Sequence, residues 1–367
     1  MSIDRESLRR AIANGESVSR VSIGPLDLSG CDLSGGMFDT VSFDGTRLSG
    51  ARLTHCVFDN CVFTDVDLSH ADLSGTLFRG GAIVRTALCR SVLDGCNLNA
   101  TQARDVDFSG ARADRFLCVN ADLAGSRFDD AHIARAYFDQ TPLHDASFQN
   151  ARIQTSLFYR LDLRFTVFAG AQFDRAVFTE SDLSEQRLSG QHLNRCQFIS
   201  SRLRVVDLSH AHLANCNFQD AVLDGACLDG VDAPHTVFYR ASGAALQCRH
   251  AQLQNSLWVD AQVPRADFSD ANLRGAVWHR ANASDAQFVR TVLEGADFSD
   301  ATLTAARFDQ SSLSGTCFDN AVADETSLAQ WANLSGAHGH DPAAHAAKGW
   351  SRQRNARRMH LSNGSPS

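Results

Sequence analysis

Every fifth residue from Ile23 to Leu328 is a bulky apolar side chain or, at a few places, a smaller one, and no insertion or deletion breaks this register over sixty-two pentads. The run from Leu28 to Phe38, LSGCDLSGGMF, shows the unit: a small residue, a polar residue, a bulky apolar residue and two turn formers. A period of five fits neither the roughly 3.6-residue period of an α-helix nor the two-residue period of a strand. Each pentad has two inward positions, a small slot and a bulky slot two residues later, so the backbone must turn a corner once per pentad. An uninterrupted short period of this kind predicts a solenoid.

The bulky slots also vary with a period of twenty residues. One column, sampled at every twentieth residue from Phe38 to Phe318, is aromatic except at Leu98 and Cys118. This modulation predicts four pentads in each coil, with one wall of the solenoid lined by stacked rings. We therefore interpret the phenylalanines as core residues and not as a ligand cage.

Several pentads match the pattern A(D/N)LxX, among them those that begin at Ala71 (ADLSG), Ala121 (ADLAG) and Ala271 (ANLRG). In this respect the chain resembles the pentapeptide-repeat family over roughly residues 21–330. The resemblance implies an all-β fold, a right-handed quadrilateral parallel β-helix in which each coil is hydrogen-bonded to the coils above and below. About fifteen coils at a spacing of ~4.8 Å would give a length of roughly 70–75 Å.

The continuous register predicts one elongated repeat domain at 21–330, with a helical cap at each end. Residues 1–20 form the expected N-terminal cap, with a helix over 2–14 that presents Leu8, Ala11 and Ile12 to the first coil and stops at Asn14-Gly15. Residues 331–367 form the expected C-terminal cap and a basic, partly disordered tail. Trp331 and Leu334 are candidates to cover the far end, followed by a second short helix over 342–348.

Composition restricts the location of the protein. No apolar run approaches the ~18 residues of a membrane span, and the first residues do not read as a signal peptide, so we expect a cytoplasmic protein.

Eight of the eleven cysteines occupy inward slots and no CxxC pair occurs, which favours a structural filling role over metal or redox chemistry. These eight are Cys31, Cys56, Cys61, Cys96, Cys118, Cys196, Cys216 and Cys248.

Residue types that are catalytic in many enzymes occur here at positions that the repeat explains. His, Ser, Asp and Cys recur at the spacing of the turns, and no glycine-rich phosphate loop, zinc signature or inserted loop interrupts the register. We predict no catalytic, cofactor-binding or metal site, and we expect the protein not to be an enzyme.

One outward column differs from the other three, which are mostly polar. It immediately precedes the aromatic column and is largely apolar, which is typical of an interaction surface. The alternative is that this face is the most strand-like and favours β-branched and aromatic residues for that reason, although Leu and Met lack this preference. The candidate residues, which we call the apolar stripe, are Met37, Val57, Leu77, Leu117, Tyr137, Leu157, Val177, Val237, Leu257 and Val277.

The C-terminal tail is basic. It is interpreted as a solvated tail or, alternatively, as a docking segment for an acidic protein or nucleic acid, although direct binding of nucleic acid is not expected of the protein as a whole. The candidate docking residues are Lys348, Arg352, Arg354, Arg357 and Arg358.

These features favour a non-enzymatic scaffold that binds a protein partner, or itself as a homodimer, through the apolar stripe or its ends. The resemblance implies two alternatives: binding to DNA gyrase or topoisomerase by DNA mimicry, as in the quinolone-resistance group, and an accessory or effector role in a secretion system. Charge argues against mimicry. Residues 21–340 carry 38 acids and 25 bases, a net charge of 25 − 38 = −13, with the bases interspersed. Duplex DNA of ~73 Å would carry about 43 negative charges.

Overall fold

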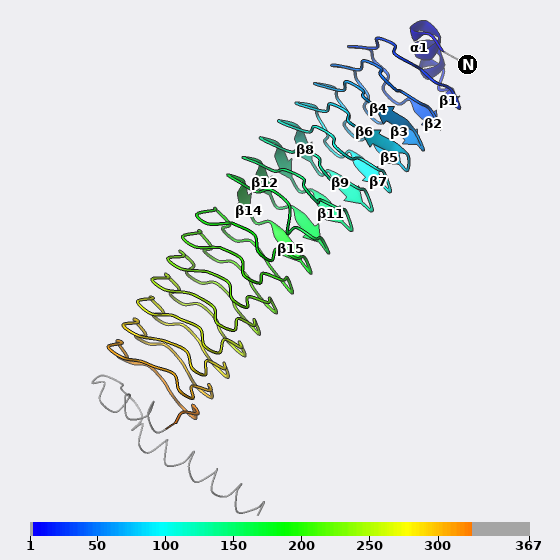
Figure 1. The fold of residues 1–367 in the computed structure, drawn as a ribbon. Helices are drawn as coiled ribbons and strands as arrows, with labels where there is room; N and C mark the ends of the chain where they lie inside the picture. Colours follow the sequence, from blue (N-terminus) through cyan, green and yellow to red (C-terminus); the bar gives the residue numbers. More distant parts are fainter. Residues whose placement is uncertain (1–2, 325–367) are drawn as a thin grey trace, which may run out of the picture. The chain divides into compact units, whose positions relative to one another are not determined.

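A computed structural model of the protein describes residues 3–324, which fold as a parallel β-solenoid (Figure 1). The chain divides into two compact units. Unit 1 comprises Met1–Gln186 with Gln191–Phe198, and unit 2 comprises Arg187–Gly190 with the chain from Ile199 onward. The predicted C-terminal cap, with Trp331, Leu334 and the helix over 342–348, lies outside the described residues.

The named elements all belong to unit 1. They are α1 (Arg5–Ala13), β1 (Ser17–Ser19), β2 (Met37–Asp39), β3 (Val57–Asp59), β4 (Val62–Thr64), β5 (Leu77–Arg79), β6 (Ala82–Val84), β7 (Asn97–Asn99), β8 (Arg112–Asp114), β9 (Leu117–Val119), β10 (His132–Ala134), β11 (Tyr137–Asp139), β12 (Arg152–Gln154), β13 (Leu157–Tyr159), β14 (Gln172–Asp174) and β15 (Val177–Thr179).

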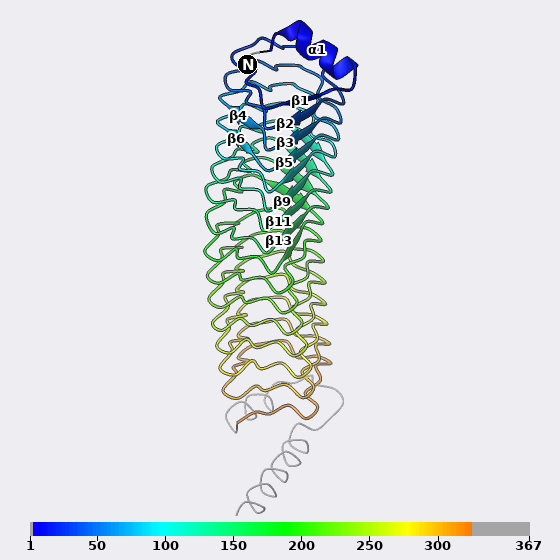
Figure 2. The same ribbon diagram turned by 90° about the vertical axis from the view of Figure 1, so that its right-hand side faces the viewer.

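The strands pair in parallel at a step of twenty residues, which confirms the predicted coil of four pentads. The longest sheet has the order β1-β2-β3-β5-β7-β9-β11-β13-β15, and Phe58, for example, pairs with Phe38 and Phe78. Two smaller sheets, β14-β12-β10-β8 and β4-β6, lie on other faces. Figure 2 shows the strands of the long sheet stacked one after another.

The strands account for about eight turns of the solenoid, whereas fifteen coils were predicted. The numbers differ because a three-residue strand does not form on every coil. Elsewhere a single residue bridges to the next coil before the backbone turns again. In the described part of unit 2 the pairing consists of such single bridges, as between Val237 and Leu257, still at the twenty-residue step.

The corners explain why the pentad ends in turn-forming residues. At a typical corner the amide of Cys56 donates to the carbonyl of Leu53 (3.2 Å), and His55 between them has a left-handed φ of 56°. The His55 amide then donates to the carbonyl of Ser74 in the next coil (2.9 Å). Left-handed φ at the third turn position favours Gly, Asn and Asp, which are frequent at this position of the repeat.

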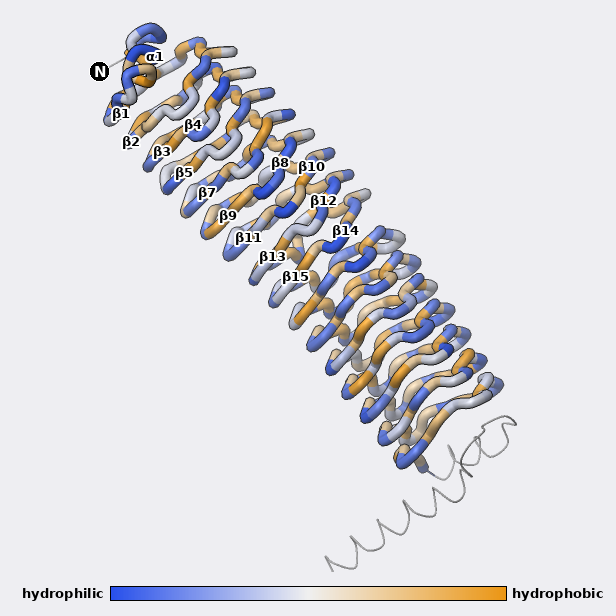
Figure 3. Tube along the Cα trace, turned by 180° about the vertical axis from the view of Figure 1, so that it is seen from behind, coloured by the Kyte–Doolittle hydropathy of each residue, from blue (hydrophilic) through white to orange (hydrophobic). Residues whose placement is uncertain are grey.

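The core follows the two inward slots of each pentad, so hydrophobic and hydrophilic residues alternate along the turns (Figure 3). The aromatic column forms stacks within each unit: the rings of Phe38 and Phe58 lie 4.9 Å apart, and those of Trp258 and Trp278 lie 4.7 Å apart. Hydroxyls in the small slot are satisfied by the preceding coil, as where Thr76 Oγ1 donates to the carbonyl of Leu53 (2.6 Å). This contact explains why Ser and Thr are tolerated in the interior.

The eight cysteines predicted to lie inside are all buried and free, as expected for filling residues. Burial raises the pKa of Cys56 to about 12 and that of Cys61 to about 11, which disfavours the thiolate.

The predicted N-terminal helix is confirmed as α1, which lies beside β1 (Figure 2). The Asp4 side chain caps it by accepting a hydrogen bond from the Ser7 amide (2.7 Å), and Leu8 is buried against the solenoid. Asn14 ends the helix, and Gly15 follows with a φ of 70°. The helix therefore covers the first edge of the sheet, where unpaired backbone groups would otherwise be open to other chains.

Two buried tryptophans give a stability prediction. Trp258 Nε1 donates to Ser256 Oγ (2.8 Å), whereas the buried Trp278 Nε1 has no hydrogen-bond partner and Ala276 stands where Ser256 stands one coil earlier. Because an unsatisfied buried donor is unfavourable, Ala276→Ser should raise the free energy of unfolding by about 1 kcal/mol, measured by denaturant titration. Ala296→Ser in the next coil, which faces Phe298, is the control. Equal effects of the two substitutions would contradict the prediction.

Candidate interaction surface

In unit 1 the apolar stripe is formed by the first residues of successive strands in the long sheet. Met37, Val57 and Leu77 pair in register on β2, β3 and β5. After Asn97 on β7, a second run follows on β9, β11, β13 and β15. This second run consists of Leu117, Tyr137, Leu157 and Val177. Asn97 therefore divides the stripe of unit 1 into two apolar patches.

Most stripe residues are half-buried. Among the stripe residues only Met37 and Leu257 are exposed, with 43% and 39% of their surface accessible to solvent. Nine of the fifteen strands in residues 3–324 lie on this face, so the apolar stripe coincides with the most strand-rich face that the structure describes. That agreement supports strand preference as one reason for the composition of this face.

Unit 2 carries a shorter run of the stripe. Val237, Leu257 and Val277 bridge one another at the twenty-residue step, with Asn217 and Asp297 at the two ends of the run. The structure thus brings the stripe residues together as ladders within each unit, and polar residues limit each ladder.

A tyrosine and an arginine lie together beside the stripe in each unit. The Arg160 guanidinium lies 4.6 Å from the centre of the Tyr159 ring, and its Nε donates to Glu180 Oε2 (2.9 Å). In unit 2, Arg240 lies 4.8 Å from the centre of the Tyr239 ring and forms two hydrogen bonds to the Asp220 carboxylate, of 2.6 and 2.7 Å. Each arginine is held in place by a ring and a carboxylate.

The contacts of Tyr159 and Tyr239 with their arginine partners were not predicted from the sequence. A signal was present: each tyrosine precedes an arginine, and an acidic residue stands twenty positions away from that arginine. The hydrogen bond from Arg240 keeps the pKa of Asp220 below its usual value, and the bond to Glu180 raises the pKa of Arg160.

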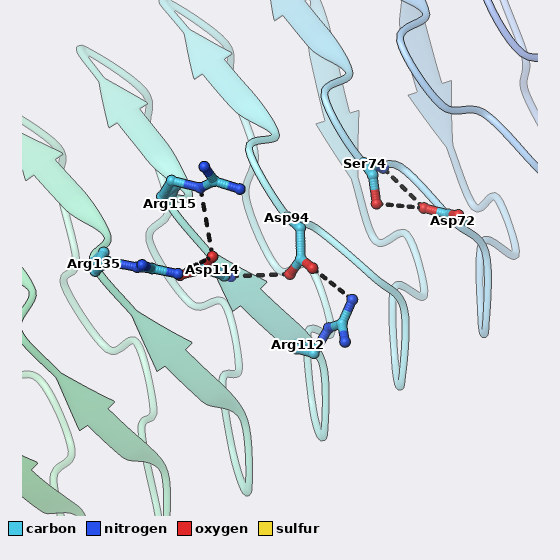
Figure 4. Close-up of polar contacts among 7 residues, drawn as sticks. All are labelled: Asp72, Ser74, Asp94, Arg112, Asp114, Arg115 and Arg135. Carbon is cyan, nitrogen blue, oxygen red and sulfur yellow. Dashed lines mark hydrogen bonds and ion pairs between the residues drawn. The ribbon is translucent and has the colours of Figure 1, made fainter.

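Pairing of opposite charges between coils is general on the surface. Arg112 pairs with Asp94, and Arg135 donates to Asp114 (2.7 Å) (Figure 4). Other pairs join residues that are twenty positions apart, as in Arg280 with Asp260 and Arg290 with Asp270. Many surface carboxylates of each unit are thus paired with an arginine of the same or a neighbouring coil.

Several exposed apolar residues were not predicted, among them Phe165. Phe165 stands at a corner, is 55% exposed, and contacts His144 edge-on and Arg164 through its ring. This corner lacks the left-handed φ, and the amide of Gln186, which fills a small slot of the next coil, donates to the carbonyls of Leu163 and Thr166. The signal in the sequence was a phenylalanine at a turn position, outside the bulky slot.

Residues 3–324 contain no group of three or more His, Cys, Asp and Glu side chains arranged to hold a metal ion. Within the same residues, no helix combines the length and the apolar character that a membrane span requires. The candidate docking residues Lys348, Arg352, Arg354, Arg357 and Arg358 lie outside the part of the chain that the structure describes.

The family model for pentapeptide repeats matches more than half of the chain. Eight copies are found, over residues 42–80, 156–190, 196–240, 247–277, 265–300 and 286–322. The chain belongs to the pentapeptide-repeat family. Family members of this kind are generally structural or binding scaffolds.

Solved pentapeptide-repeat structures are also similar to this chain. A trypsin-treated variant of QnrB1, a plasmid-mediated fluoroquinolone resistance protein, is 18% identical over 43% of this chain and 90% of its own, with a TM-score of 0.27. HetL, involved in heterocyst differentiation regulation in the cyanobacterium Nostoc sp. strain PCC 7120, is 20% identical over 86% of this chain and 96% of its own, with a TM-score of 0.16. Rfr23 from the cyanobacterium Cyanothece 51142 is 18% identical over 39% and 88%, with a TM-score of 0.17. A search of curated proteins finds no match.

The paired carboxylates predict a pH dependence. Because the folded-state pKa of Asp220 lies below the ordinary 3.8, its contribution to stability is present above that value and is lost as the pH falls through the folded-state pKa. Asp220→Asn should therefore lose less stability than the wild type between neutral and acid pH. Asp285→Asn, at another left-handed corner and without an ion-pair partner among the described residues, is the control for the loss of a surface carboxylate as such. Thermal unfolding at several pH values would measure this, and identical slopes for both variants would contradict it.

Proposed function

We propose that this pentapeptide-repeat protein is a non-enzymatic, cytoplasmic scaffold that binds a protein partner, or a second copy of itself, through the apolar stripe. The observation that carries the proposal is the ladder of Leu117, Tyr137, Leu157 and Val177 in unit 1, with Tyr159 and Arg160 beside it.

The composition of this region supports binding. Tyrosine and arginine are enriched among residues that dominate binding energies, and a ring or guanidinium already held in one conformation loses little entropy on binding. Arg160 is fixed by Glu180 and by the Tyr159 ring before any partner arrives. The backbone beneath the ladder is a hydrogen-bonded parallel sheet, so the apolar side chains keep a regular spacing of ~4.8 Å.

Gyrase binding by DNA mimicry receives less support. A mimic needs a face on which negative potential is nearly continuous, whereas many surface carboxylates here are paired with arginines, as in Arg249 with Asp229 and Arg85 with Asp65. Inhibition of gyrase supercoiling by low micromolar protein would nevertheless favour mimicry over the scaffold proposal.

The test of the stripe is a charge placed in its centre. Leu157→Asp should raise the dissociation constant of a homodimer at least about tenfold, because an unpaired carboxylate would be buried in the interface. Val62→Asp is the matched control, since Val62 is also a half-buried first residue of a strand but lies on another face. Multi-angle light scattering across a range of concentrations and salt would measure the effect, and association should depend little on salt.

A wild-type monomer at every concentration would exclude a second copy as the partner. The binding protein would then be sought by affinity capture from a cell extract, with both variants run in parallel. If Leu157→Asp and Val62→Asp retained the same proteins in the same amounts, the stripe would not be the binding surface.

A further inference from the structure

The face formed by β8, β10, β12 and β14 has a different character from the apolar stripe. The first residues of these strands are Arg112, His132, Arg152 and Gln172, and all four are exposed. The strands pair in register, so these side chains form a ladder of hydrogen-bond donors on a rigid sheet.

Two hollows lie on this face. One, of about 360 Å³, is lined by Asp130, His132, Asn150, Arg152, Gly170 and Gln172. The other, of about 350 Å³, is lined by Arg152, Gln154, Gln172, Phe173, Asp174 and His192. Arg152 and Gln172 belong to both hollows, so these two side chains lie at the centre of the concave region.

Arg152 differs from its arginine neighbours in having no carboxylate partner among the described residues. Arg112 is paired with Asp94, Arg115 and Arg135 with Asp114, and Arg175 with Asp174 (Figure 4 shows the first three). Asp130 lines the first hollow together with Arg152, yet the two do not come within ion-pair distance. Neither Arg152 nor Asp130 forms an ion pair with any described residue, so the hollow holds a cation and a carboxylate that lack salt-bridge partners there.

The corner that borders this hollow is fixed by close packing. A side chain at Gly170 would collide with Asn150 Oδ1, so glycine at 170 leaves room for the Asn150 amide. Asn150 and Gln172 add neutral amide groups to the lining, and His132 adds an imidazole.

We propose that the hollow lined by Asp130, His132, Arg152 and Gln172 binds a phosphate group that carries a proton. The Arg152 guanidinium is suited to contact two phosphate oxygens, and the amide of Gln172 and the imidazole of His132 supply further donors. The Asp130 carboxylate accepts a hydrogen bond from the protonated phosphate oxygen, whereas it repels an anion without a proton. The site thus selects hydrogenphosphate over sulfate, and it is independent of the apolar stripe.

The test is calorimetric titration of the full chain with inorganic phosphate, sulfate and glycerol phosphate at matched ionic strength. Phosphate should bind about tenfold more tightly than sulfate, and Arg152→Gln should weaken phosphate binding at least about tenfold. Asp130→Asn should remove the preference for phosphate over sulfate. Arg202→Gln is the control, because Arg202 is also an exposed residue at the same pentad position and has no ion-pair partner among the described residues.

Each outcome has a definite meaning. The titrations are run at a pH near the second pKa of the phosphate ester, where part of each ligand still carries a proton. If glycerol phosphate binds as tightly as inorganic phosphate, the ligand is a phosphorylated small molecule. Weaker binding of glycerol phosphate would favour free phosphate. Equal binding of phosphate and sulfate by the wild type would overturn the role of Asp130. Equal phosphate binding by the wild type, Arg152→Gln and Arg202→Gln, or no binding by the wild type, would overturn the site. Thermal unfolding of each variant checks that the fold is retained.

Discussion

The hydrogen bond between backbone groups of adjacent coils is the interaction on which the other features of each unit depend. Residues twenty positions apart pair in parallel, whether they lie in a strand or form a single bridge. This pairing places identical pentad positions above one another, so a residue type that recurs every twenty residues becomes a column. Aromatic stacks, hydroxyl contacts to the preceding coil, charge pairs and the apolar stripe are all consequences of that alignment.

The interior could be predicted from the sequence because the side chain at each inward slot points into the core, and each slot accepts side chains of one size class. Phe58 stacks on Phe38, Cys56 is buried, and Leu8 covers the first coil as expected. The number of turns with regular strands could not be predicted, because a three-residue strand and a single bridge share the same pentad pattern. A strand forms where the residues on both sides of the bulky slot keep an extended backbone, and a single bridge forms where they do not. The types of these side chains do not reveal which of the two occurs.

The surface was predicted less completely, since an outward side chain has several conformations and several neighbours. The column of the stripe was found from its period, but the arginine that lies over Tyr239 was not, because its contact also depends on Asp220 one coil earlier. Arg152 illustrates the opposite case. That it forms no ion pair with a described carboxylate becomes visible only when the partners of the surrounding arginines are known.

The twenty-residue step has a consequence for how such a chain can change length. A duplication or loss of twenty residues within a unit adds or removes one whole coil and leaves every later side chain in its own column. A change of five residues keeps the pentad intact but moves all later residues to the neighbouring face, so that Phe78 would stack on a residue from a different wall. During evolution, this fold should therefore tolerate the gain or loss of a complete twenty-residue coil far better than the gain or loss of a single pentad.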